Sequence, residues 1–500
     1  MTVTADDTGT GTGTALPVSD EAFHVEQHGI DHIPERERWA RPRDVASMWA
    51  GASFNIEYFV YGAILLGFGF TFWQAVSIII IGNLSWFLVG LCSLQGPQTG
   101  TTVFAINRAS YGPNGSRLIA FFNWITQLGF ETEGLILIVG AGLVLSSKAG
   151  FQPGTPAKVV FILLAVAVQI VLPFLGHATM VRVLKVLIVP FGVIFGVLLI
   201  YGLIHGHTTG AGASYDNWQL YLGGLAFTIT LSGLGWTECG NDYSRYLPPN
   251  ASKGQTIGWL FLATALPEML MMSIGALAFT FVGSDAIWNG ANPFQAFTAQ
   301  HSIPGVFVVI FLVFALVQLF AINSLDLYSS GVTLQALGLR LKRYQAVILD
   351  SVICLGVTFW AVFDSHFSTY LKDFVDVVIV WIAPWCAIFL VDWAMRKFHY
   401  VPRELQKTDR SSIYWANGGV NWAAIVAQVV GMFAAISGLY ATFPLPSWLN
   451  EVVVHSGGAD FSVYLGLGVG GILYFLLAGP LVRRQRRVQD EALAAASSIV

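Results

Sequence analysis

Two short segments place glycines and an acidic side chain inside otherwise apolar stretches of this sequence. The first reads GASFNIE and ends in Glu57, and the second reads GLGWTECGNDYSRYLP over 233–248 and contains Glu238. In apolar surroundings a carboxyl group can exchange a proton or accept N–H groups from a bound molecule. Glycines favour an opened backbone, which a membrane tolerates only where protein buries it or water reaches it. A pair of such interrupted segments predicts the substrate site of a transporter.

Six acidic residues fall deep in apolar stretches that contain no lysine or arginine: Glu57, Glu131, Glu133, Glu238, Glu268 and Asp326. An ionisable group at this depth indicates a functional site unless it is neutralised. Three interpretations are open: the acids are protonated and hydrogen-bonded, they carry a coupling proton, or they face a cationic or N–H-rich substrate. Four further acids lie near the ends of apolar stretches, where we expect water or headgroups to reach them: Asp350, Asp373, Asp376 and Asp392.

Trp236 lies between two glycines and next to Glu238. A planar indole in an opened helix could stack on a planar substrate while the carboxylate binds its edge. Phe130 is a weaker candidate of the same kind. The predicted substrate-binding residues are Ser53, Asn55, Glu57, Phe130, Glu131, Gly235, Trp236, Glu238 and Asp326, and four of them are candidates for proton coupling: Glu57, Glu131, Glu238 and Asp326.

The elements that must position these residues are membrane-spanning helices. Only 11% of the 500 residues are charged while 55% are hydrophobic, which predicts an all-α polytopic membrane protein because soluble proteins carry about 25% charged residues. Twelve apolar runs are each about long enough to cross the hydrocarbon: 44–67, 72–95, 118–147, 158–175, 181–205, 219–241, 257–283, 304–332, 345–364, 372–396, 419–443 and 462–482. The four cysteines show no metal-binding or redox spacing, and no metal site is expected.

Basic residues predict the orientation in the membrane. With the N-terminus in the cytoplasm, all of the 25 Lys and Arg except Lys148, Lys158 and Lys372 fall on the cytoplasmic side, as the positive-inside rule requires. Both termini are therefore expected in the cytoplasm, with the protein in the cell membrane.

The two glycine-marked spans are five spans apart, which predicts two inverted five-helix repeats. The expected divisions are a cytoplasmic tail over 1–43 with its first ~20 residues disordered, repeats over 44–205 and 219–396, an appended helix pair over 419–482, and a cytoplasmic tail over 483–500.

Several motifs in order resemble the purine/cytosine permeases of the nucleobase–cation symporter family one. They are FWQA at 72–75, GPQTG at 96–100, RASYG at 108–112, NWITQLGF at 123–130 and DYSRYLP at 242–248. The resemblance runs from about Ile30 to at least Gln335. It implies a twelve-helix carrier of the leucine-transporter type, with discontinuous helices 1 and 6, that imports a nucleobase together with a proton or sodium ion.

The resemblance also implies roles for individual residues. Trp236 matches the tryptophan that opens the family's sixth-span motif, Phe130 stands where many members have tryptophan, and Asp326 stands where asparagine is usual. The GFETEG segment at 129–134 departs from the commoner GWFGVN-like pattern and leaves the particular substrate open. Sodium-coupled members carry a Ser/Thr pair on the eighth span, where this chain has Phe320 and Ala321. Hard cations need several oxygen ligands, so the expected coupling ion is a proton.

The sequence thus predicts a proton-coupled importer of cytosine or purines that needs no cofactor and binds no nucleic acid. Alternatives from the same class are importers of allantoin, hydantoin, a thiamine precursor or a B6-type vitamer, and a sodium-coupled carrier. A membrane enzyme is disfavoured because no histidine has ligand spacing with cysteine or aspartate. A channel would not need two glycine-broken helices with buried acids. The expected partners are a small substrate and the lipid bilayer, and the sequence gives no indication of an oligomeric state.

Overall fold

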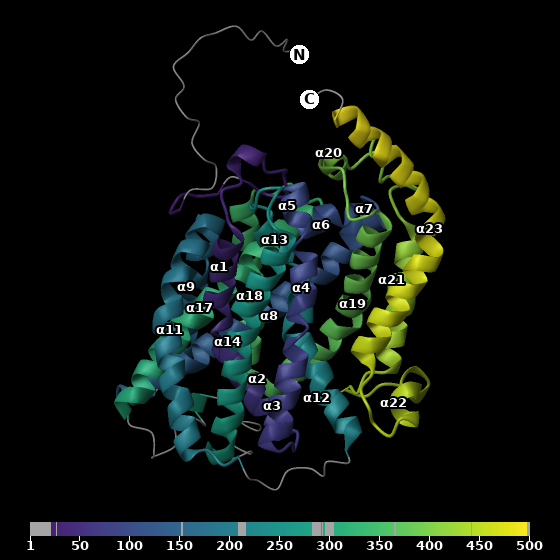
Figure 1. Cartoon of the computed structure of the whole chain (residues 1–500). Helices are drawn as coiled ribbons and strands as arrows, with labels where there is room; N and C mark the ends of the chain where they lie inside the picture. The colour runs from purple at the N-terminus through teal and green to yellow at the C-terminus, as the bar shows by residue number, and fades with distance from the viewer. Residues whose placement is uncertain are drawn as a thin grey trace, which may run out of the picture.

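The protein is a bundle of helices (Figure 1). The structure, a computed structural model, describes residues 22–497 except 27, 152–153, 209–216, 283–291, 293, 296–304, 365–366 and 442. All regular structure in these residues is helical, and nine of their helices are long and apolar enough to cross a membrane. The predicted all-α membrane protein is therefore confirmed. The first ~20 residues, which were expected to be disordered, lie outside the described residues.

The helices follow the expected apolar runs. The first part of the chain forms α1 (Pro42–Ser53), α2 (Ile56–Gly67), α3 (Phe72–Asn83), α4 (Trp86–Cys92), α8 (Gly115–Lys148), α9 (Thr155–Gln169), α10 (Val171–Leu175) and α11 (His177–His205). The rest forms α12 (Trp218–Leu231), α13 (Gly240–Ser244), α14 (Lys253–Val282), α17 (Gly305–Ala336), α18 (Arg343–Asp364), α19 (Phe367–Met395), α21 (Trp422–Ser437) and α23 (Ser462–Ser497). Short helices α5 (Gln95–Thr99), α6 (Val103–Ile106), α7 (Arg108–Tyr111), α20 (Pro402–Gln406) and α22 (Glu451–His455) lie in the connections. The C-terminal segment from residue 483, predicted as a tail, continues α23 to residue 497.

The first span is broken between α1 and α2, as the glycine-marked segment predicts. Asn55 caps α2 by accepting the Glu57 N–H at 2.9 Å. From α17, Gln318 accepts the Ile56 N–H at 2.8 Å and donates to the Ala52 carbonyl at 3.3 Å. Because water is scarce at this depth, each opened backbone group needs such a partner. One side chain of α17 therefore satisfies both sides of the break.

The sixth span is broken as well. Helix α12 ends at Leu231, a 3₁₀ turn covers Gly233–Trp236, and α13 begins at Gly240. A Cβ added to Gly233 would lie 2.2 Å from the backbone of Ser85 and Trp86, and one added to Gly235 would lie 2.4 Å from the Thr230 carbonyl. Only glycine fits such close approaches. The glycines therefore let the opened segment pack directly against neighbouring backbone.

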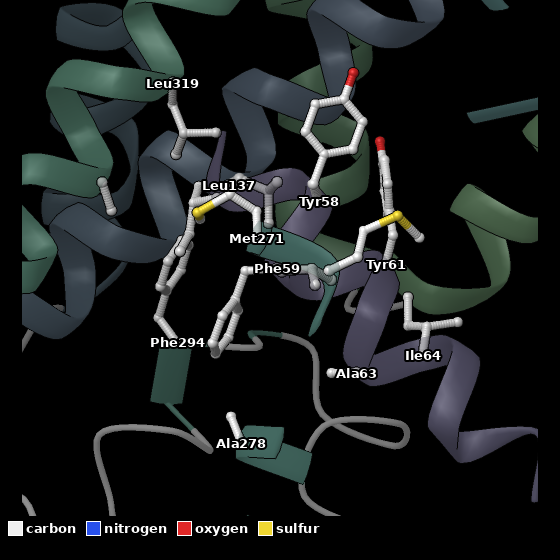
Figure 2. Close-up of a cluster of buried hydrophobic side chains, with 14 of the residues drawn as sticks. Tyr58, Phe59, Tyr61, Ala63, Ile64, Leu137, Met271, Ala278, Phe294 and Leu319 are labelled. Carbon is white, nitrogen blue, oxygen red and sulfur yellow. The ribbon is translucent and has the colours of Figure 1, made fainter. Parts of the chain in front are cut away.

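The central core lies where α2, α8, α14 and α17 meet. Figure 2 shows Tyr58, Phe59 and Tyr61 of α2 gathered with Leu137 of α8, Met271 of α14 and Leu319 of α17. Two glycines bring α2 and α14 together, because Gly62 faces the Met272 carbonyl and Gly275 faces the Phe59 carbonyl with no room for a Cβ. Small residues at a crossing are how membrane helices approach closely.

Two acids that were expected near water are instead buried. Asp392 on α19 pairs with Arg396 at 2.9 Å and accepts from the Tyr474 hydroxyl of α23 at 2.6 Å. Asp350 on α18 is also fully buried. The prediction was wrong for both, because neighbouring helices cover the side of the helix end on which these carboxyls lie.

Candidate substrate site at the helix breaks

Helix α8 packs beside the break in the sixth span. Gln127 Nε2 on α8 donates to Glu238 Oε1 at 2.7 Å, just beyond the 3₁₀ turn of the sixth span. Phe130 lies one turn further along α8, and its Cζ would be 4.0 Å from a Cβ built on Gly235. The structure therefore brings together three predicted site residues, Phe130, Gly235 and Glu238, from two segments about a hundred residues apart.

Trp236 is held by both halves of the broken first span. Its Nε1 donates to the Tyr58 hydroxyl of α2 at 3.0 Å. Its ring lies edge-to-face with Trp49 of α1, with centroids 5.3 Å apart. The side chain is buried but retains 8% exposure. The indole orientation is thus fixed by contacts across the two breaks, which suits a stacking surface.

Three buried carboxyl groups come from α2, from α17 and from the turn between Trp236 and α13. The Asp326 carboxyl of α17 is within electrostatic range of Glu57 on α2 and of Glu238. Glu57 Oε2 accepts from Asn55 Nδ2 at 2.7 Å. Glu238 Oε2 and Asp326 Oδ1 have no hydrogen-bond partner within the described part of the chain. Because buried like charges without a countercharge are costly, such a cluster must hold protons or a ligand that donates hydrogen bonds.

The remaining predicted site residues occupy other positions. Ser53 is buried in the last turn of α1, and Asn55 serves as the cap of α2. The Glu131 carboxyl is directed toward α18, where Cys354 Sγ donates to its Oε2 at 3.2 Å. Glu131 thus faces α18 and lies within electrostatic range of the central carboxyls through Asp326.

Sequence reasoning missed four polar residues that hold this region together: Tyr58, Tyr61, Gln127 and Gln318. Tyr61 donates to Glu133 Oε1 at 2.7 Å, and Figure 2 shows the Tyr58 and Tyr61 hydroxyls directed to the same side of α2. Gln127 and Gln318 are uncharged amides in apolar stretches, so the pattern of charged residues does not mark them. Each became informative only once its partner on another helix was known.

The DYSRYLP motif fixes the end of the broken sixth span. Asp242 accepts from the Val103 N–H at 2.9 Å and from Ser329 Oγ at 2.7 Å. Ser244 donates to the Ser93 carbonyl at 2.7 Å. These bonds tie α13 to the connection after α4 and to α17. The motif therefore positions the site without forming part of it.

The sequence matches one protein family over most of its length. Residues 32–462 match the family described as permease for cytosine/purines, uracil, thiamine, allantoin. This range begins where the motif resemblance begins and extends well beyond Gln335.

Curated relatives agree with this assignment. A Bacillus subtilis (strain 168) protein assigned by name to the purine-cytosine permeases, YxlA, is 27% identical and covers 93% of this chain and 99% of its own. Purine-cytosine permease fcyB of Emericella nidulans is 24% identical, and the match covers 91% of this chain and 88% of fcyB. Vitamin B6 transporter TPN1 of Saccharomyces cerevisiae is 22% identical, and the match covers 91% of this chain and 87% of TPN1.

Solved structures support the fold. MHP1, a nucleobase-cation-symport-1 family transporter in a closed conformation with bromovinylhydantoin bound, superposes with a TM-score of 0.71 at 18% identity, over 95% of this chain and 96% of that one. Its inward-facing conformation gives a TM-score of 0.68 at 19% identity, with 93% and 95% covered. From its sequence and its fold, the chain belongs to the family of permeases for cytosine/purines, uracil, thiamine and allantoin, whose members are membrane transporters and not enzymes.

Proposed function

We propose that this permease imports cytosine or a purine across the cell membrane by proton symport. The observation that carries the proposal is the group of three carboxyls, Glu57, Glu238 and Asp326, beside the held indole of Trp236. Two of their oxygens have no partner among the described residues. A nucleobase offers a flat ring with adjacent N–H donors, which matches an aromatic face next to free acceptors.

In this proposal the ring of the base lies between Trp236 and Phe130. Its N–H edge donates to Glu238 and Asp326, while Gln127 and Asn55 keep Glu238 and Glu57 in place. Gly235 brings the backbone close to the base, and Ser53 lines the end of α1. A buried acceptor strongly disfavours a ligand that lacks the matching donor, so the acids would select amino-bearing bases over di-carbonyl compounds.

The first helix break supports proton over sodium coupling. In the sodium-coupled members that this chain resembles, backbone carbonyls of span 1 and a hydroxyl pair of span 8 hold the ion. Here the Gln318 amide of α17 donates to the Ala52 carbonyl, and Phe320 and Ala321 supply no hydroxyl. An amide N–H therefore takes the place at a carbonyl where a cation would bind, and the carboxyls are free to carry the proton.

The proposed orientation places both termini in the cytoplasm. The described start of the chain and the far end of α23 lie at the same end of the bundle, together with α5, α6, α13 and α20 (Figure 1). The basic residues of the tails favour that end as the cytoplasmic one. We expect alternating access through movement of the two five-helix repeats, 44–205 and 219–396, around the site.

A second candidate is a cationic or amine-bearing heterocycle such as a B6-type vitamer. The surplus of acids favours it, and the similarity to a vitamin B6 transporter is consistent with it. Allantoin, hydantoin and thiamine precursors are further members of the substrate class to be tested.

The experiment is uptake of labelled cytosine, adenine, guanine and hypoxanthine by cells that lack their own nucleobase carriers, with and without a protonophore. Glu238→Gln and Trp236→Ala are compared with exposed residues of the same types, Glu451→Gln and Trp448→Ala. We expect saturable uptake that the protonophore and the two site variants abolish while the controls retain it.

Two results would contradict the proposal. Absence of uptake of every base by well-expressed protein would exclude the nucleobase substrate and direct the assay to pyridoxine-like and ureide compounds. Uptake that depends on a sodium gradient and is unaffected by the protonophore would exclude proton coupling.

A further inference from the structure

Two buried acids lie along the interface where α8, α17 and α18 pack against one another. On α18, Asp350 accepts from Trp124 Nε1 and from Ser330 Oγ, each at 2.8 Å. One turn further, Cys354 donates to Glu131 of α8 at 3.2 Å. The Glu131 and Asp350 side chains therefore follow one another along the same helix interface.

Ser330 lies between these two acids. Its hydroxyl donates to Asp350 Oδ2, and it is also close enough to the Glu131 carboxyl to interact with it. Ser330 lies one helical turn beyond Asp326 on α17, so both residues present side chains to the same face of that helix. Asp326 is itself within electrostatic range of Glu131. Polar groups thus continue from the central carboxyls to Asp350.

A purely structural role does not account for the buried polar groups Glu131, Ser330 and Asp350. An asparagine could hold Trp124 as well as Asp350 does, without the cost of an ionisable group in the membrane. Glu131, Ser330 and Asp350 are fully buried, whereas their neighbours on α18, Ile348 and Val352, are exposed on the lipid side. Glu131 Oε1 also has no hydrogen-bond partner in the described ranges. The titratable groups acting on Glu131 are Asp350, Asp326 and Cys354, and none of them carries a positive charge.

We propose that Glu131, Ser330 and Asp350 form the route by which the coupling proton leaves the central carboxyls. The inference rests on the proton coupling proposed above. The protonated Glu131 gives its proton to the Ser330 oxygen as the Ser330 hydroxyl passes its own proton to the Asp350 carboxylate. Glu131 is left as a carboxylate that receives the next proton from Asp326, and Ser330 remains a hydroxyl that turns back. Asp350, which neighbouring helices cover in this conformation, gives up its proton when alternating access admits water to this end of the interface. Asp350 is seven residues from the first residue of α18, about 10 Å along the helix, near the end of the bundle that holds the described start of the chain.

The test separates proton-driven accumulation from exchange in proteoliposomes. The protein is assayed with the base that it takes up best among cytosine, adenine, guanine and hypoxanthine. Accumulation is driven by an imposed proton gradient. Exchange of internal labelled base for external unlabelled base requires no net proton movement. The variants are Asp350→Asn and Ser330→Ala, and the matched control is Ser351→Ala, a buried serine next to Asp350 whose Oγ has no partner in the described part of the chain.

We expect Asp350→Asn and Ser330→Ala to lose gradient-driven accumulation while retaining exchange, and Ser351→Ala to retain both. Accumulation by Asp350→Asn at the native level would overturn the route. Loss of exchange together with accumulation in both variants would also overturn it, because it would indicate a structural role. Failure of the proposed proton coupling itself is recognised separately, because the native protein would then not accumulate the base when a proton gradient is imposed.

Discussion

Arg245 Nη2 lies 3.3 Å from Glu26 Oε1, and both side chains are completely buried. The pair joins the segment before the first span to the DYSRYLP motif, 219 residues further along the chain. Arg245 also donates to the Tyr328 hydroxyl at 2.8 Å and to the Gly29 carbonyl. The described residues before α1 are therefore part of the packed end of the bundle.

Replacing one member of this pair is expected to destabilise the protein. Glu26→Gln leaves the Arg245 guanidinium buried without its countercharge, which costs about 3–5 kcal/mol when a buried pair is broken. Thermal unfolding in detergent measures the effect. The control is Glu35→Gln, an exposed acid in the same segment. Equal stability of the two variants would show that water or another group compensates Arg245.

The crossing of α2 and α14 predicts that replacement by alanine is destabilising at one glycine of α14 and tolerated at another. A Cβ on Gly275 would lie 1.8 Å from the Phe59 carbonyl, whereas one on Gly258 meets nothing within 4 Å. Gly275→Ala should therefore force the helices apart and cost about 1–3 kcal/mol, and Gly258→Ala should be neutral. Melting temperatures of the purified variants test this. Equal melting temperatures of the two variants would mean that α2 and α14 can separate to admit the methyl group with no loss of stability.

The sixth-span break predicts a loss of transport from a single methyl group. In Gly235→Ala the new Cβ would meet the Thr230 carbonyl at 2.4 Å, so the 3₁₀ turn that carries Trp236 must shift. We expect well-expressed protein with no uptake of the substrate that the native chain carries. The control, Gly223→Ala on α12, adds its methyl group in open space and should retain uptake. Normal transport by Gly235→Ala would contradict a fixed geometry at this turn.

The side-chain amide of Gln318 is expected to maintain the break in the first span. Gln318→Leu removes the acceptor of the Ile56 N–H and the donor to the Ala52 carbonyl. An orphaned buried polar group costs about 1–3 kcal/mol, so we expect lower thermal stability together with reduced uptake. Gln255→Leu, at an exposed position of α14, controls for loss of an amide. A stable and active Gln318→Leu variant would mean that water replaces the amide at the break.

Local features of the sequence were sufficient to predict the helices and their interruptions. The length of an apolar run decides whether a segment can span the membrane, and glycines beside polar residues mark where the backbone opens. Both signals lie within a few residues of the feature that they predict. Glu57, Trp236 and Glu238 were predicted as candidate site residues in this way because each lies in or beside a marked break.

Only the tertiary structure decided which side chains meet. Gln318 lies more than 250 residues from the break that it satisfies, and nothing near it in sequence indicates that partner. The same applies to Asp350 and Asp392, whose sequence positions suggest contact with water although neighbouring helices cover them. Position along a helix gives the depth of a residue, whereas burial and hydrogen bonding depend on which helix packs against that face. The sequence therefore determined the spans, the breaks and the acids, and packing decided which acids lie near the breaks and which lie along the neighbouring interface of α8, α17 and α18.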